Sequence, residues 1–159
     1  MGLFGPKRDP KKVGEQSEQV IIAQLMAVGY SVLVPVGEYH RYDLVIEDAD
    51  GKFWRVQCKT AWLEKRLGNE VVKFATSSSH YHYRGGKYDH GRRGYQGQVE
   101  YLAVYSPDLD KMYLIPIDHA GASDHLAQLN WESSCQRRRN GGQSFHEAFV
   151  FSERISWYA

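Results

Sequence analysis

The pattern of hydrophobic and polar residues predicts one long helix followed by a series of strands. Asp9 and Pro10 suit the N-cap and the first position of a helix, and Gly29 suits the position just after its end. Apolar residues recur at helical spacing between these points, so we expect a helix over residues 10–28. Beyond it, short apolar runs bounded by turn residues predict strands at 30–36, 42–46, 54–60, 70–75, 99–105 and 111–117.

Two pairs of these strands carry the signature of a β-hairpin. The acidic turn at residues 47–51 ends in Gly and is short enough to join its two flanking strands directly. Residues 106–110 include Pro and Asp and join the last two strands in the same way.

The remaining segments lack a clear hydrophobic period. Residues 76–98 contain five glycines, so we expect a long loop, which inside a compact domain is usually functional or disordered. Residues 120–129 are expected to form a short helix, and residues 131–142 a basic loop. Residues 146–158 are expected to form either a short helix or a last strand, because their periodicity does not decide.

The order of these elements predicts the fold class. A helix, a strand, a hairpin, another strand and a second hairpin favour an α/β (α+β) domain with a central mixed β-sheet flanked by helices. The chain has 159 residues, of which 42% are hydrophobic and 25% charged, as is typical of one globular domain. We therefore expect a flexible basic N-terminal arm at residues 1–9 and a single domain at residues 10–159.

Composition also narrows the class of protein. No apolar run approaches the roughly 20 residues that a membrane helix needs, so no membrane partner is expected. Cys58 and Cys135 are the only cysteines, and Cys58 lies within a predicted strand, which argues against a disulfide framework. The default compartment is therefore a reducing cytoplasm.

The first predicted hairpin brings several chemically active residues together. Because side chains alternate along a strand, Gln57 and Lys59 share one face, and we expect this face to meet Asp43 on the partner strand. The Asp43 carboxylate, the Gln57 amide oxygen and the Cys58 main-chain oxygen would suit Mg²⁺. Lys59 would then orient a water molecule or offset charge in the transition state. The alternative is an Asp at the sheet edge beside a surface Gln and Lys.

The predicted helix offers a further carboxylate. Glu18 lies three residues before Ile21 and four before Ile22, which places it on or beside the inward face. Glu15 lies one turn earlier, beside the same row. Either could reach the hairpin, and the alternative is that both are solvated surface residues.

Basic charge is concentrated in the expected loop at 76–98, although the net charge of the chain is only +1. Basic residues with interleaved tyrosines suit phosphate contact and base stacking. Arg41 is expected either to contact a phosphate or to pair with Glu38. The alternative is a set of solvated loops. The candidate DNA-contacting residues are Arg41, Ser77, Ser78, Ser79, Arg84, Lys87, Arg92, Arg93 and Tyr95.

Taken in order, these residues resemble a known family. Glu18, Asp43 and Gln57-Cys58-Lys59 resemble the PD-(D/E)XK nuclease pattern, and the helix is similar to that of archaeal Holliday junction resolvases. A Gln in place of the usual acid resembles the branch of homing endonucleases encoded in group I introns. Further similarity to that branch lies at residues 95–105, 112–118 and 140–148.

This resemblance implies a restriction-endonuclease-like core and a Mg²⁺-dependent endonuclease, with Mn²⁺ able to substitute. It would cut duplex DNA as a homo-oligomer, a dimer or a tetramer, leaving a 5′-phosphate and a 3′-hydroxyl. In these terms Asp43 is the metal ligand, Gln57 an active-site polar ligand and Lys59 the catalytic lysine. Glu18 is the helix acid, with Glu15 as its substitute if the helix is rotated.

Two other functions stay open at this point. One is a Holliday junction resolvase, which the long expected loop disfavours. The other is a DNA-binding module that has kept the fold but lost cleavage, with Gln57 as the first symptom, because an acid at this position usually binds the metal directly.

Overall fold

The computed structural model describes residues 9–66, 69–120, 126–130 and 149–151. Residues 1–8 of the predicted arm, the predicted basic loop at 131–142 and Cys135 lie outside the described residues. Within the described part, no helix is long and apolar enough to cross a membrane.

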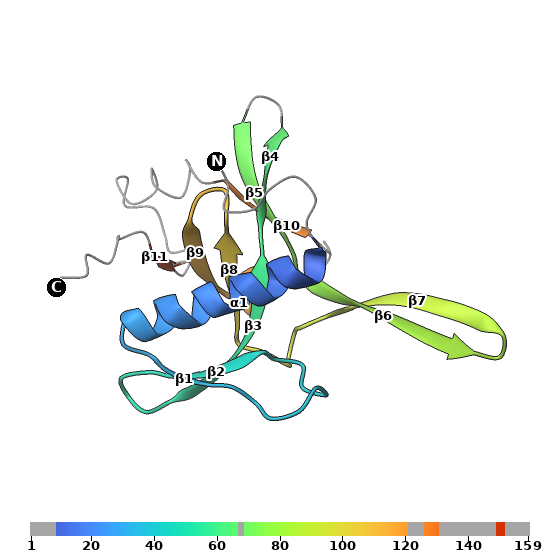
Figure 1. Ribbon diagram of the computed structural model, residues 1–159, viewed down its shortest axis with the longest axis horizontal. Helices are drawn as coiled ribbons and strands as arrows, with labels where there is room; N and C mark the ends of the chain where they lie inside the picture. Colours follow the sequence, from blue (N-terminus) through green and yellow to red (C-terminus); the bar gives the residue numbers. More distant parts are fainter. Residues whose placement is uncertain (1–8, 67–68, 121–125, 131–148, 152–159) are drawn as a thin grey trace.

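A six-stranded mixed sheet forms the centre of the molecule (Figure 1). Its strands in spatial order are β1 (Ser31–Leu33), β2 (Leu44–Glu47), β3 (Phe53–Thr60), β8 (Tyr101–Ser106), β9 (Lys111–Pro116) and β11 (Phe149–Phe151). β3 and β8 run parallel, and the other neighbours run antiparallel. The predicted central mixed sheet is therefore confirmed.

The helix α1 (Pro10–Ala27) lies across one face of this sheet (Figure 1). The Asp9 carboxylate caps its start by accepting a hydrogen bond from the Lys11 N–H at 3.0 Å. Gly29 follows its end with a φ of 102°, a conformation that glycine adopts without strain. The predicted bounds of 10–28 are thus correct to within one residue.

Buried apolar side chains hold α1 against the sheet. Ile21 and Leu25, one turn apart, have no exposed surface. They form one cluster with Leu44 of β2, Val56 of β3 and Ala103 of β8. Burying a side chain as large as Leu or Ile stabilises the fold by about 1.5–3 kcal/mol relative to exposing it. This row therefore sets which face of α1 meets the sheet.

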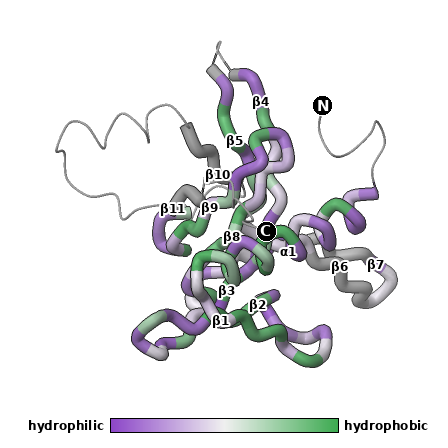
Figure 2. Tube along the Cα trace, turned by 60° about the vertical axis from the view of Figure 1, so that its left-hand side comes forward, coloured by the Kyte–Doolittle hydropathy of each residue, from purple (hydrophilic) through white to green (hydrophobic). Residues whose placement is uncertain are grey.

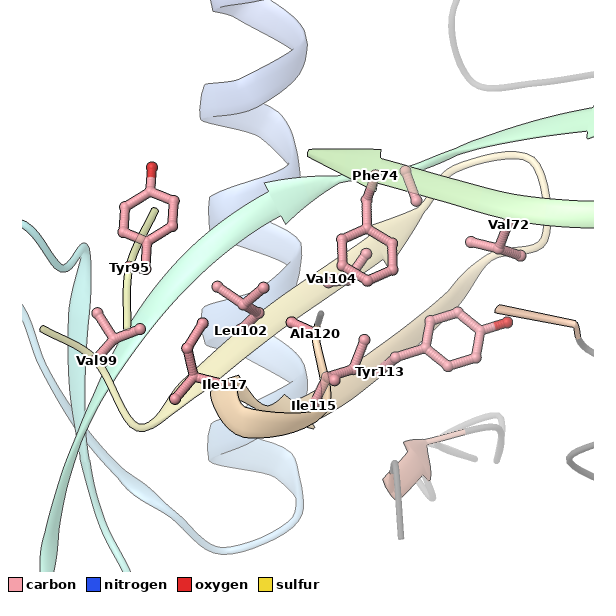
Figure 3. Packing of buried hydrophobic residues seen from close by; sticks show 11 residues of the cluster. Val72, Phe74, Tyr95, Val99, Leu102, Val104, Tyr113, Ile115, Ile117 and Ala120 are labelled. Carbon is pink, nitrogen blue, oxygen red and sulfur yellow. The ribbon is translucent and has the colours of Figure 1, made fainter. Parts of the chain in front are cut away.

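A second cluster covers the opposite face of the sheet (Figure 3). Val72 and Phe74 of β5 pack there against Leu102 and Val104 of β8. β5 belongs to a three-stranded sheet of β10 (Leu126–Asn130), β5 (Asn69–Ala75) and β4 (Trp62–Arg66). In the described residues a small sheet thus covers this face, where the sequence predicted a flanking helix. Figure 2 shows hydrophobic stretches around β8 and β3 and hydrophilic residues at the free end of β4.

The prediction of a long loop at 76–98 is wrong. Two strands, β6 (Ser77–Arg84) and β7 (Lys87–Gly94), form a hairpin that extends away from the body of the molecule (Figure 1). Gly85 and Gly86 make its two-residue turn with φ values of 58° and 80°. The segment was predicted as a loop because it lacks apolar alternation, but a hairpin that projects from the core need not bury either face and does not need this pattern. The Gly85-Gly86 pair was the turn signal that the prediction overlooked.

The structure changes three other predictions. The helix expected at 120–129 is wrong where it is described, because Leu126–Asn130 is a strand paired with β5. The open edge of β5 supplies hydrogen bonds that override local propensity. β1 is shorter than the strand expected at 30–36, and a 3₁₀ turn, η1 (Ile117–His119), follows β9. The strand alternative for 146–158 is confirmed at Phe149–Phe151, which pairs with β9.

Candidate active site

Asp43 lies at the point where β2 begins, and β3 holds its main chain and its side chain. The Asp43 N–H donates to the Val56 carbonyl at 3.0 Å, which continues the ladder between the two strands. Its Oδ2 accepts a hydrogen bond from the Cys58 N–H at 2.8 Å and another from the Gln57 amide. The two strands therefore bring Asp43 and Gln57 together, as the hairpin pattern predicted.

The surroundings of Asp43 disfavour its charged form. Burial raises the pKa of this carboxyl, while the Cys58 N–H, the Lys59 ammonium and the Gln57 amide act to lower it. The net shift is upward, so these three groups do not fully compensate for the loss of water. A half-buried carboxylate in this condition is a candidate functional group.

Glu18 of α1 lies within electrostatic range of Asp43. Burial raises the pKa of Glu18, and the nearby carboxylates of Asp43 and Glu15 raise it further. The pKa of the Cys58 thiol is also raised, by burial first and then by Asp43 and Glu18. Glu18, Asp43 and Cys58 thus lie within electrostatic range of one another, whereas Glu15 is exposed one turn earlier on α1.

A buried polar contact sets the position of α1 over β3. The Thr60 hydroxyl donates to the Ser17 hydroxyl oxygen at 2.7 Å, and Ser17 is 1% exposed. Ser17 lies four residues before Ile21 and eight before Leu25, in the buried row of the helix. It was missed because it is polar, although its spacing placed it on the inward face. This contact keeps the neighbouring Glu18 beside the site.

Lys59 contacts a tyrosine far along the chain. Its Nζ donates to the Tyr95 hydroxyl oxygen at 2.8 Å and lies 4.6 Å from the centre of the Tyr95 ring. Tyr95 is 3% exposed and belongs to the core cluster under β8. The prediction that Tyr95 contacts DNA through its ring is therefore corrected, because its packing leaves almost no surface for a base.

Arg41 lies beside the same tyrosine, and its guanidinium is engaged at the root of the hairpin. Its Nη1 donates to the Ser78 hydroxyl at 2.6 Å, and its Nη2 donates to the Gly94 carbonyl at 3.1 Å. Its Nε donates to the Gln98 side chain. These contacts replace the pairing with Glu38 that the sequence offered as one possibility. Contact of Arg41 with a phosphate stays a prediction.

The other candidate DNA-contacting residues follow the hairpin. Lys87, Arg92 and Arg93 are exposed on β7, and Ser79 is exposed on β6. Ser77 and Ser78 are half-buried at its root. The side chain of Arg84 lies outside the described part of the chain. Their role in binding DNA stays a prediction.

An ion pair that the sequence analysis did not foresee ties β3 to the start of β8. Arg55 Nη2 lies 2.5 Å from Glu100 Oε1, and the Arg55 N–H donates to Glu100 Oε2 at 2.7 Å. The hydrogen bonds from Arg55 lower the pKa of Glu100. Arg55 shares the face of β3 that carries Gln57 and Lys59, so this pair helps to hold that face in register.

The donor atoms at this site fit a hard divalent cation. Asp43 supplies carboxylate oxygens, Gln57 an amide oxygen and Cys58 a main-chain oxygen, which are the ligand types that Mg²⁺ prefers. A cation would also relieve the cost of burying the Asp43 charge. Among the described residues, no group of three or more His, Cys, Asp or Glu side chains is arranged to hold a metal. The set therefore depends on Gln57 and on main-chain oxygen.

Comparison with known proteins identifies the family. The family model for PD-(D/E)XK endonuclease matches residues 8–148. The solved structure of a bacterial homing endonuclease, I-Ssp6803I, is similar with a TM-score of 0.62 and 27% sequence identity, over 77% of this chain and 78% of that chain. No curated protein sequence matches the chain. Because the family model spans most of its length, this chain belongs to the PD-(D/E)XK endonuclease family.

Proposed function

We propose that the protein is a Mg²⁺-dependent endonuclease of homing type that hydrolyses phosphodiester bonds in duplex DNA, with Mn²⁺ able to substitute. One observation carries the proposal. Asp43 accepts hydrogen bonds from the Cys58 N–H and the Gln57 amide, and Lys59 lies two residues after Gln57 on the same face of β3. Family membership supports endonuclease chemistry, and the likeness to I-Ssp6803I supports the homing type.

The metal would be held by Asp43, Gln57 and the main-chain oxygen of Cys58. In the present arrangement the Gln57 amide nitrogen faces Asp43, so the amide would turn to present its oxygen to a cation. When bound, a divalent cation supplies Lewis-acid chemistry, because it polarises a phosphate oxygen and makes a neighbouring water more acidic.

The side chains of the protein would supply positioning and charge. Lys59 would present a positive charge where negative charge grows on the attacked phosphate. Glu18, whose pKa is raised by burial and by Asp43, would accept a hydrogen bond from the attacking water. The water oxygen bonds to phosphorus as the bond to the 3′ oxygen breaks. The released water proton passes to solvent and the leaving 3′ oxygen takes up a proton from solvent, so the products are a 5′-phosphate and a 3′-hydroxyl.

Duplex DNA would lie along the β6–β7 hairpin. Lys87, Arg92 and Arg93 are exposed there, and each would neutralise a phosphate. Arg41, Ser78 and the neighbouring serines lie where the hairpin meets the site. A homo-oligomer would cut both strands, because a two-fold axis relates two copies of the site to antiparallel strands.

One feature favours a second candidate, a DNA-binding module without cleavage. Gln57 is neutral where the family pattern commonly has an acid, so the site holds one negative charge fewer for a metal. A junction resolvase is the remaining alternative within the enzyme class. The three candidates differ in what they cut, and one experiment separates them.

The test compares wild-type protein with Lys59→Ala and with Lys65→Ala, a control at an exposed position of β4. Each is incubated with Mg²⁺, a genomic fragment library and a four-way DNA junction. We expect wild type and Lys65→Ala to cut duplex fragments at defined sites, and Lys59→Ala to cut about 10²–10³-fold more slowly. Cutting of junctions alone indicates a resolvase. Binding without any cutting indicates the inactive module, and an undiminished rate in Lys59→Ala rejects the site.

A further inference from the structure

A buried tyrosine joins the candidate catalytic lysine to the root of the β6–β7 hairpin. Tyr95 follows β7 directly and is 3% exposed. Its hydroxyl oxygen accepts a hydrogen bond from Lys59 Nζ at 2.8 Å, and the same Nζ lies 4.6 Å from its ring centre. One side chain thus holds the Lys59 ammonium through both its hydroxyl and its ring.

The core and a tight turn keep Tyr95 in place. The Tyr95 carbonyl accepts hydrogen bonds from the N–H groups of Gln98 at 2.9 Å and Val99 at 3.2 Å. Its ring belongs to the cluster with Val99 and Leu102 (Figure 3). A lysine side chain is flexible and loses conformational entropy when it is ordered. A rigid acceptor of this kind therefore selects one position for the ammonium.

Arg41 ties this tyrosine to both strands of the hairpin. Its guanidinium carbon lies 4.7 Å from the centre of the Tyr95 ring. Its nitrogens donate to the Ser78 hydroxyl of β6 at 2.6 Å and to the Gly94 carbonyl of β7 at 3.1 Å. Arg41 also lies two residues before Asp43 in the chain. The position of the hairpin root and the position of Lys59 are therefore set by one connected group of side chains.

We propose that Tyr95 is a positioning residue that keeps the Lys59 ammonium at the site. Through Arg41, the position of this ammonium depends on the orientation of the β6–β7 hairpin relative to the rest of the protein. The proposal rests on the proposed nuclease function. Through this connection, DNA that binds the hairpin and fixes its orientation also orders Lys59 for cleavage. A tyrosine that only fills the core would influence folding but would leave Lys59 unaffected.

The first test removes the hydroxyl and keeps the ring, in Tyr95→Phe. The control is Tyr105→Phe, because Tyr105 is 1% exposed and its hydroxyl donates to Asp110 at 2.9 Å, at the turn between β8 and β9. We expect the single-turnover cleavage rate of Tyr95→Phe to fall about tenfold, with the DNA dissociation constant unchanged. Tyr105→Phe should cut at the wild-type rate. A Tyr95→Phe rate equal to or above wild type overturns the proposal.

The second test concerns Arg41. Arg41→Lys keeps the charge, but the single nitrogen of lysine cannot take the three separate positions from which the guanidinium nitrogens donate to Gln98, Ser78 and Gly94. We expect a loss of cleavage rate similar to that of Tyr95→Phe. The double variant should lose little more than either single variant, because both changes act through the position of Lys59. Losses that multiply would overturn the connection.

A third measurement does not depend on cleavage. Lysines are reductively methylated with ¹³C, and the Lys59 signal is identified as the one missing in Lys59→Arg. We expect this NMR signal to move in Tyr95→Phe and to stay in place in Tyr105→Phe. An unmoved signal in both overturns the proposal. Wild-type protein that cuts no DNA rejects the nuclease function alone, because this signal still reports whether Tyr95 holds Lys59.

Discussion

The side-chain amide of Gln57 donates to the same carboxylate oxygen of Asp43 that accepts the Cys58 N–H. A neutral donor thus occupies the place where the family pattern commonly has a second carboxylate. Because Gln57 is uncharged, it adds no further repulsion between carboxylates in the metal-free protein. Such repulsion is already present, since Asp43 raises the pKa of Glu18 and both raise the pKa of Cys58. The neutral Gln57 amide also reduces the negative charge that would attract a metal. Gln57 is therefore expected to make the protein more stable without a metal and to lower its affinity for a cation.

This balance predicts opposite effects of Gln57→Glu with and without metal. In EDTA the new carboxylate would repel Asp43, so the melting temperature should fall. With Mg²⁺ the extra ligand should tighten binding, and each tenfold gain in affinity adds about 1.4 kcal/mol to stability at saturating metal. Differential scanning fluorimetry across a Mg²⁺ titration measures both effects. Gln16→Glu, on the exposed side of α1, is the control, and an identical response of the two variants would reject the metal site.

Asp43→Asn should stabilise the metal-free protein at neutral pH. The folded-state pKa of Asp43 is raised, mainly by burial, so its charged form makes the folded state less stable. This penalty is fully present above the raised pKa. It disappears as the pH falls toward the unfolded value of about 3.9. Asn removes the penalty and can still accept from the Cys58 N–H.

Melting temperatures in EDTA from pH 4 to pH 8 check this sign. The gain from Asp43→Asn should be largest at the highest pH and should shrink as the solution is acidified. Asp50→Asn, in the exposed turn before β3, is the control and should give a curve parallel to wild type. A melting temperature of Asp43→Asn below wild type at pH 8 would show that burial of this charge does not destabilise the fold.

Local patterns predicted the helix and the contact between Asp43 and Gln57 correctly. The cap at Asp9, the acidic turn before β3 and the alternation along β3 all lie within a few residues of what they determine. They were enough to bring Asp43 and Gln57 together, because the register of a hairpin follows from its turn. The buried row that includes Ile21 likewise oriented α1, and with it Glu18.

Such local patterns could not predict contacts between segments that are far apart in the sequence. Lys59 and Tyr95 are 36 residues apart, and nothing around Tyr95 signals that its ring is buried beside two cations. β10 is a strand because it pairs with the edge of β5, which no property of its own residues requires. The β6–β7 hairpin is different, since Gly85-Gly86 was a local turn signal that could have been recognised.

The β6–β7 hairpin should contribute a salt-dependent part of DNA affinity. Lys87, Arg92 and Arg93 are exposed on β7, and Arg84 is the fourth basic residue of the hairpin. If all four contact phosphates, changing them to Gln should reduce the slope of log K against log [salt] by about 3–4, at about 0.9 for each phosphate. Binding is measured in EDTA between about 50 and 200 mM salt, so that cleavage does not interfere. Lys52→Gln combined with Lys65→Gln, on other exposed turns and strands, is the control and should keep the wild-type slope. An unchanged slope in the fourfold variant would mean that DNA lies elsewhere on the protein.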